Sequence, residues 1–169
     1  MSRFLLFRVD NRLVHGQVCT VWIPENLVKR VVIIHDEYAK DDFLIKLHKN
    51  VVPKGVQCDT ISSEQAIEEW NRDQFGEENT IVLFQDVKTA LKLYKMGLVY
   101  NELQVATLAG TKDSVCIYKQ VNVSPENARI MLEIIDHGVD MYCQMYSSEP
   151  RVQVKELLYQ KKTKAKLKL

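Results

Sequence analysis

The chain has 169 residues, 46% of them hydrophobic, and a formal net charge of +1. This length suits one substantial core, so we expect a single domain over residues 1–160 and a basic, flexible tail over residues 161–169. Without the five lysines of that tail, 18 basic residues stand against 22 acidic ones, which excludes a basic face for nucleic acid. A membrane-spanning helix needs about 20 apolar residues, and no apolar run approaches that length. The first residues do not resemble a signal peptide. We therefore expect a cytoplasmic protein.

Apolar runs of strand length alternate with helical patterns along the chain. This alternation predicts an α/β fold: an open, mostly parallel, twisted sheet of about seven strands with helices on both faces. The expected strands cover residues 4–9, 31–35, 56–61, 80–84, 103–107, 115–123 and 139–145. After the first strand, residues 17–29 have a helical pattern that Pro24 interrupts, so a kink or restart is expected near Ile23.

The later helices have clear start and stop signals. Apolar residues at helical spacing predict helices over residues 39–49 and 86–96. Ser62 and Ser124 precede two further helices as N-caps, and Gly97 and Gly138 follow helical segments, where a left-handed C-cap is favoured. The four cysteines are widely spaced, which is typical of neither a zinc site nor a disulfide framework, and we expect them to be reduced and mostly buried.

One segment concentrates chemically useful side chains. Between the first strand and the first helix stand Arg8, Asp10, Asn11, Arg12, His15, Gly16 and Gln17. In a parallel sheet this turn lies at the carboxyl edge, where functional loops gather. A neutral imidazole offers one nucleophilic nitrogen while the other accepts or donates an orienting hydrogen bond. His15 is therefore a candidate acceptor of a phosphoryl group.

The neighbours of His15 suit a dianionic group. Arg12 provides a forked guanidinium for phosphoryl oxygens and is expected to stabilise charge in the transition state. Asp10 is expected to orient Arg12 or the second ring nitrogen. Asn11 suits a turn with unusual backbone angles, and Gly16 allows close approach of backbone amides. Arg8 and Gln17 complete the expected phosphoryl-binding set. The sequence predicts no cofactor and no metal ligand set.

The segment RVDNRLVHGQV at residues 8–18, followed by Val21-Trp22, resembles the signature of the enzyme IIB components of the mannose, fructose and sorbose family of the bacterial phosphotransferase system. Similarity continues in HDEYA at 35–39, VPKGV at 52–56, MGL at 96–98 and SSEP at 147–150. The resemblance implies a mostly parallel twisted sheet flanked by helices. It also implies that a IIA protein phosphorylates the nitrogen of His15 nearer the backbone, with Arg12 and Asp10 close by.

The resemblance further implies partners. His15 would donate to a sugar held by the membrane-embedded IIC and IID components, and the chain would associate peripherally with the membrane through that transporter. Related proteins form dimers, so a homodimer stays open, as does the identity of the sugar. The basic tail has two interpretations: a solvated end, or weak attraction to an anionic membrane surface or an acidic partner.

Two segments depart from the family pattern and leave an alternative open. Residues 104–107 read QVAT where the family has Asn-Val-Gly-Gly, and the loop at 110–114 reads GTKDS where basic residues and glutamine are usual. We expect this loop beside the His15 turn. The change at 104–114 leaves transport itself open, so the alternative is a regulatory IIB-like module that does not support sugar transport.

Other polar residues have ordinary interpretations. His35-Asp36-Glu37, with Asp41 and Asp42, is an imaginable metal site, but acidic turns beside helix starts are usually capping features. His48 and His137 are expected to face solvent. A nucleotide-binding sheet is excluded because no glycine-rich phosphate loop follows any strand.

Overall fold

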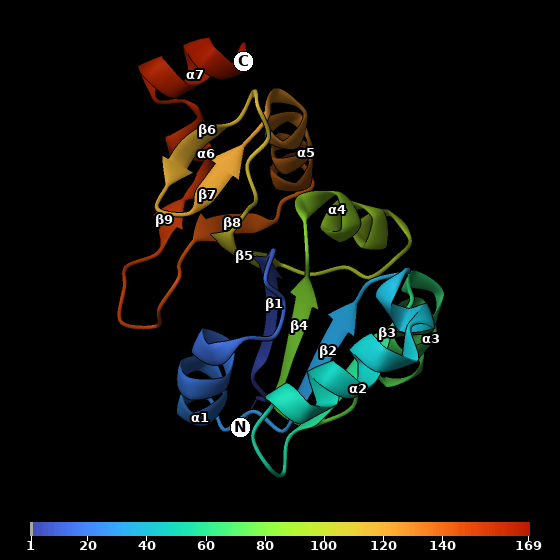
Figure 1. Ribbon diagram of the computed structural model, residues 1–169. Coiled ribbons are helices and arrows are strands. Elements are labelled where there is room, and N and C mark those ends of the chain that lie inside the picture. Colours follow the sequence, from blue (N-terminus) through green and yellow to red (C-terminus); the bar gives the residue numbers. More distant parts are fainter. Residues whose placement is uncertain (1) are drawn as a thin grey trace.

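A computed structural model describes residues 2–169. Its main sheet has seven strands in the order β3-β2-β4-β1-β5-β8-β9 (Figure 1). Six of them are parallel neighbours: β1 (Leu5–Asp10), β2 (Arg30–Ile34), β3 (Gln57–Ile61), β4 (Thr80–Phe84), β5 (Glu102–Thr107) and β8 (Asp140–Cys143). The short strand β9 (Val152–Gln153) runs antiparallel to β8 at the edge. The predicted α/β class with an open, mostly parallel sheet is confirmed.

The central strands are buried on both faces. Phe7 and Val9 of β1 point into one core, whereas Leu6 points into the other, because successive side chains alternate across a strand. The larger core is covered by α3 (Ser63–Asp73), α4 (Val87–Lys95), α5 (Pro125–Asp136) and α6 (Val154–Leu158). The smaller core is covered by the first crossover and by Val52 after α2 (Asp42–Val51). Helices therefore lie on both faces, as predicted.

Side-chain caps set the helix starts. Ser62 forms a reciprocal capping box with Gln65 at α3, and Ser124 accepts a hydrogen bond from the Asn127 amide at α5. Asp41 caps α2, which begins three residues later than expected because Tyr38–Lys40 form a separate 3₁₀ turn, η2. Gly97 and Gly138 follow α4 and α5 with φ of 110° and 92°, the left-handed conformation that the sequence predicts.

The first crossover adapts to Pro24. Gly16 and Gln17 are helical and lead into a π-helical turn, η1 (Val18–Trp22), before the short helix α1 (Ile23–Glu25). The Ile23 amide bonds to the Val18 carbonyl five residues earlier. Proline cannot donate to the carbonyl four residues before it, so the widened turn accommodates the missing bond. The predicted restart near Ile23 is confirmed.

Two predicted regions are wrong in detail. Residues 115–123 form a hairpin of β6 (Val115–Tyr118) and β7 (Val121–Val123) outside the main sheet, not one strand. The turn between them places Lys119 at a φ of 42°, which a single strand cannot contain. His48 is buried, not solvent-facing, because its Nδ1 lies 2.8 Å from the Thr60 hydroxyl of β3.

The expected tail also needs correction. Residues 161–167 form the helix α7 (Lys161–Leu167), which packs against β6 and α6. Thr163 and Leu167 lie one helical turn apart and are buried at this contact, so the helical spacing gives the lysine-rich segment an inner face. In residues 2–169, no helix combines the length and apolar character needed to cross a membrane.

Candidate functional site

The His15 turn begins where β1 ends. Strand β1 lies between β4 and β5, so its last residue, Asp10, is fully buried at the carboxyl edge of the sheet. The Leu13 amide bonds to the Asp10 carbonyl at 2.9 Å, and Leu13 and Val14 are buried. Leu13, rather than Asn11, takes the left-handed conformation, with a φ of 57°. Two apolar anchors thus hold the turn, and His15 follows them at the surface.

Asp10 is the centre of the site. Its Oδ2 lies 2.9 Å from His15 Nε2, and its Oδ1 lies 3.1 Å from Arg12 Nε. Arg8 Nη2 lies 3.1 Å from Oδ2, and the Thr107 hydroxyl donates to Oδ1 at 2.8 Å. Burial alone raises the pKa of Asp10, but hydrogen bonds from His15 and Arg12 and the charge of Arg8 outweigh it and hold that pKa well below its usual range. Asp10 is therefore a carboxylate at neutral pH.

Arg8 does not have the accessible position expected of a phosphoryl-binding residue. Its side chain is completely buried, bonds to Asp10 and Gln104, and stands 5.3 Å from the centre of the Trp22 ring. It also donates to Gln17 Oε1 at 2.8 Å. Burial lowers the pKa of Arg8 to about 10, so the guanidinium stays charged at neutral pH. Arg8 balances and orients Asp10 instead of facing a ligand.

His15 presents one ring nitrogen to the carboxylate and the other to the helix start. The backbone amide of Gln17 donates toward Nδ1 at 3.3 Å, and the histidine side chain is 17% exposed. A hydrogen on Nε2 satisfies Asp10, which leaves the lone pair on Nδ1. Arg12 is held on the same carboxylate and is 35% exposed, so its guanidinium lies beside the ring and in contact with solvent.

The remaining predicted residues lie around this core. Gly16 is exposed, and a Cβ atom at its position would have nothing within 4 Å. The side-chain Oε1 of Gln17 accepts hydrogen bonds from Arg8 and Arg12. The backbone amide of Asn11 donates to the Thr107 hydroxyl at 3.2 Å. The structure therefore brings all seven predicted residues together, with Arg8 inside and Arg12 outside.

Sequence reasoning missed the distant residues that complete the network. Thr107, at the end of β5, bonds to both Asp10 and Asn11. Gln104 bonds to Arg8 and donates to Gln144 Oε1 at 3.0 Å. Both lie in the QVAT segment, which we treated as a departure from the family pattern. A polar Gln104 inside an otherwise apolar strand was the available signal, because buried polar groups need partners.

The acidic turn after β2 has a structural role. Asp36 accepts hydrogen bonds from the Ser63 amide and hydroxyl at the start of α3, and from Lys92 Nζ at 2.8 Å. These bonds outweigh the effect of partial burial and lower the pKa of Asp36 to about 2. His35 Nε2 lies 2.8 Å from Gln85 Oε1. Asp36 therefore caps the start of α3, whereas Asp41 caps α2, the helix that directly follows the acidic turn.

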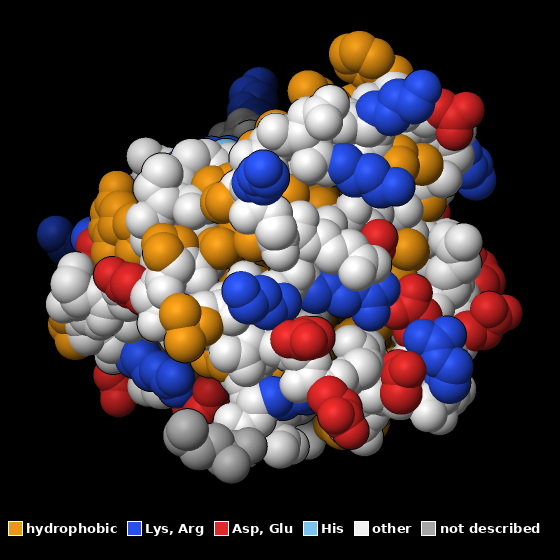
Figure 2. All heavy atoms as spheres, turned by 90° about the horizontal axis from the view of Figure 1, so that it is seen from below, with side chains coloured by type: hydrophobic (Ala, Val, Ile, Leu, Met, Phe, Trp, Pro, Cys, Tyr) orange, Lys and Arg blue, Asp and Glu red, His pale blue; other side chains and the backbone are white. Residues whose placement is uncertain are grey.

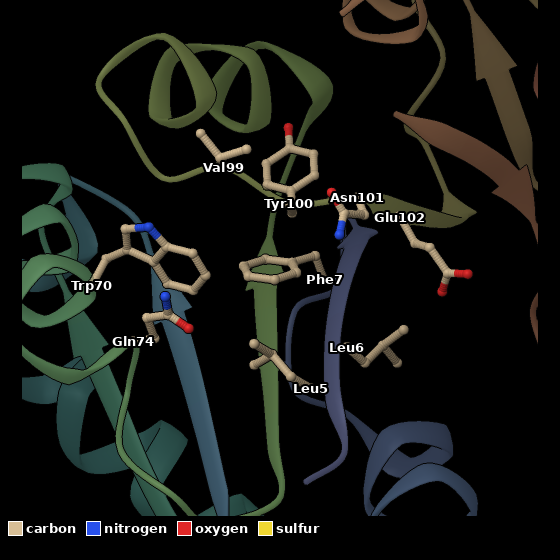
Figure 3. A pocket seen from close by; sticks show the side chains of 9 residues that line it. All are labelled: Leu5, Leu6, Phe7, Trp70, Gln74, Val99, Tyr100, Asn101 and Glu102. Atoms are coloured by element: carbon tan, nitrogen blue, oxygen red, sulfur yellow. The ribbon is translucent and has the colours of Figure 1, made fainter. Parts of the chain in front are cut away.

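Two cavities lie at opposite ends of the strands. A cavity of about 270 Å³ opens beside the His15 turn and is lined by Asn11, Gln85, Asp86, Leu108, Ala109 and Asn127. Leu108 and Ala109, the first residues after β5, therefore border the turn, whereas no residue of the loop at 110–114 lines this cavity. A wider cavity of about 560 Å³ lies at the amino ends of β1 and β5, where Trp70, Phe7 and Asn101 turn toward one another (Figure 3). It is at the end of the strands away from His15.

Comparison with known proteins agrees with this geometry. The family model described as "PTS system sorbose subfamily IIB component" matches residues 4–168. The sorbose-specific EIIB component of Klebsiella pneumoniae is 26% identical over 149 residues, covering 88% of this chain and 91% of that protein. The mannose-specific EIIAB component of Escherichia coli (strain K12) is 25% identical over 153 residues, which are 90% of this chain and 47% of that longer protein.

A solved structure agrees in fold. The crystal structure of the IIBSor domain of the Klebsiella pneumoniae sorbose permease superimposes with a TM-score of 0.84 at 25% identity, covering 92% of this chain and 96% of that one. The family match spans nearly the whole chain, including the His15 turn and α7. The chain therefore belongs to the sorbose-subfamily IIB components of the phosphotransferase system, within the mannose, fructose and sorbose family, and is a sugar phosphotransferase component.

Proposed function

We propose that His15 accepts a phosphoryl group on Nδ1 from a IIA protein and passes it to a sugar during uptake through membrane IIC and IID partners. The observation that carries this proposal is the 2.9 Å contact between His15 Nε2 and the buried carboxylate of Asp10. It fixes the proton on Nε2, so the nucleophilic lone pair belongs to Nδ1. It also stabilises the positive charge that the ring gains when Nδ1 is phosphorylated.

The surroundings of Nδ1 suit a doubly negative group. The backbone amide of Gln17 already points toward Nδ1 at 3.3 Å, and it can donate to a phosphoryl oxygen once the nitrogen is substituted. Arg12 donates to Asp10 through Nε and Nη2, and Nη2 also donates to Gln17 Oε1 at 3.4 Å, so Nη1 is the part of the fork that we assign to phosphoryl oxygens. Gly16, the residue after His15, is exposed, and a Cβ atom there would meet no other part of the protein within 4 Å. Arg12 is the residue to which we assign stabilisation of the transition state.

The two transfers balance without any further reactant. In the first, the Nδ1 lone pair forms a bond to phosphorus as the bond between phosphorus and its donor atom breaks. In the second, a sugar hydroxyl oxygen attacks phosphorus, the Nδ1–P bond breaks, and its electron pair returns to the ring. The hydroxyl proton leaves to solvent, while the Nε2 proton stays on the hydrogen bond to Asp10.

A specific observation keeps the regulatory alternative in view. The loop after β5 bonds within itself, with the Thr111 hydroxyl donating to Asp113 at 2.7 Å and the Thr111 amide donating to Ser114 at 2.8 Å. Only Lys112 adds a basic side chain to residues 110–114. Both functions include phosphorylation of His15. Membranes that contain the IIC and IID components distinguish the transport function from the regulatory one, because only a transport component yields sugar phosphate from the labelled chain.

Labelling tests the proposal directly. The chain is incubated with phosphoenolpyruvate, enzyme I, HPr and a cognate IIA protein, and its intact mass is recorded before and after acid treatment. We expect one acid-labile phosphoryl group on the wild type and none on His15→Ala. His35→Ala is the matched control, because His35 also follows a parallel strand at the same edge. Labelling that persists in His15→Ala would refute the site.

A further inference from the structure

Helix α7 has one apolar side and one basic side. Thr163 and Leu167 are buried against the body of the protein, and Leu169 packs against the larger core. The exposed face of α7 and the residue that follows it contain five lysines, hereafter the α7 lysines: Lys161, Lys162, Lys164, Lys166 and Lys168. Because the inner face fixes the helix, these lysines are held together on the outer side.

The charge of the α7 lysines is not neutralised within the protein. Among the ion pairs formed by residues 2–169, none includes an α7 lysine, although lysines on α4 pair with acids on α5. The end of the molecule at the amino ends of the strands looks different, because basic and acidic side chains are interspersed there (Figure 2). The α7 face is therefore a local excess of positive charge on a body that is otherwise net negative.

The chemistry of this face favours a diffuse anionic surface. All five basic residues are lysines, which act as flexible point charges, whereas shaped recognition of a carboxylate or phosphate favours the rigid fork of arginine. Tyr159, just before α7, is 44% exposed, and Lys164 Nζ stands 5.4 Å from its ring centre. Tyrosine is enriched where protein meets lipid headgroups. We infer that α7 binds directly to the surface of a membrane containing anionic phospholipid.

The position of α7 gives this contact a consequence. Helix α7 lies at the end of the molecule toward which β1, β2 and β4 point, at the top of Figure 1. The His15 turn follows the carboxyl end of β1 at that edge of the sheet. Lipid binding through α7 therefore keeps this end near the bilayer, where the membrane partners hold the sugar. This consequence rests on the proposed function, whereas the lipid contact itself does not.

Vesicle sedimentation tests the inference. We expect the chain to sediment with vesicles of phosphatidylcholine and phosphatidylglycerol and not with phosphatidylcholine alone. Replacing three α7 lysines, as Lys161→Gln, Lys162→Gln and Lys166→Gln together, should weaken binding on the order of 10- to 100-fold. Raising the ionic strength from about 0.02 M to about 0.5 M should also release the wild type, because salt screens the surface potential.

A matched variant controls for net charge. Lys46, Lys49 and Lys54 are exposed lysines in or just after α2, on another side of the molecule. Changing these three to glutamine should leave vesicle binding almost intact. Equal loss in both triple variants, equal binding to neutral vesicles, or no binding to either vesicle would overturn the inference. His15→Ala should bind vesicles like the wild type, and the α7 variant should still be labelled in solution, so failure of one proposal is distinguishable from failure of the other.

Discussion

Two histidines follow parallel strands at the same edge of the sheet, and their rings are bonded in the same pattern. His15 follows β1 and His35 follows β2. Each uses Nε2 toward a side chain, Asp10 at 2.9 Å or Gln85 at 2.8 Å. Each has a backbone amide near Nδ1, from Gln17 at 3.3 Å or Tyr38 at 3.1 Å.

Their surroundings differ. The partner of His15 is a buried carboxylate that also binds two arginines, whereas the partner of His35 is a neutral amide. Tyr38 stacks on the His35 ring with centres 3.6 Å apart. A phosphorylated ring is cationic and holds a dianion, so it needs a fixed negative group on one nitrogen and positive groups near the other. We therefore attribute the proposed role of His15 to its charged network and not to the position of its ring.

The largest expected effect comes from removing the carboxylate charge that distinguishes the surroundings of His15 from those of His35. Asp10→Asn leaves Arg8 buried without a counter-charge, so the free energy of unfolding should fall by about 3 kcal/mol. The matched change at the other ring, Gln85→Ala, removes a neutral bond and should cost less than about 1 kcal/mol. Urea unfolding of both variants measures the difference. Similar losses would mean that the two sites have equivalent energetics.

The next effect concerns Arg12. It bonds to Asp10, the partner of His15, and Gln85, the partner of His35, has no such bond to an arginine among residues 2–169. Arg12→Ala should slow phosphoryl transfer from the IIA protein by about 100-fold, because a charged donor to the transferring group is lost. Arg12→Lys should recover part of the rate, since it keeps the charge and loses the fork. Arg72→Ala is the control, because Arg72 is exposed on α3 and pairs with Asp73. Rapid-quench labelling gives the rates, and an unchanged rate in Arg12→Ala would remove its proposed role.

The smallest effect extends the comparison to a third histidine, His48, which is buried beside Thr60. Burial, with a smaller effect of the charge of His35, lowers the pKa of His48 below its ordinary 6.5. The unfolded chain therefore binds a proton more readily, so the contribution of His48 to stability is complete above pH 6.5 and declines as the pH falls through that value. When the pH is lowered from about 7.5 to about 5.5, the urea midpoint should fall further for the wild type than for His48→Gln. An equal fall in both proteins would contradict this assignment.

The sequence was sufficient for most of the fold. Apolar runs with turn signals predicted six of the seven strands of the main sheet, and Ser62, Ser124, Gly97 and Gly138 marked helix ends, because these preferences act over a few neighbouring residues. The two residues of β9 were too short to give a pattern. The hairpin at 115–123 was missed because its β-branched residues continue across the turn at Lys119.

The sequence by itself also identified the members of the candidate site between residues 8 and 17, because they are local to one turn. Only the tertiary structure decided their roles. It buried Arg8, exposed Arg12, and brought Gln104 and Thr107 against residues about a hundred positions earlier in the chain. The physical reason is that burial and the partners of a charge depend on which strands become neighbours. Here β5 pairs with β1, a contact that no local pattern contains.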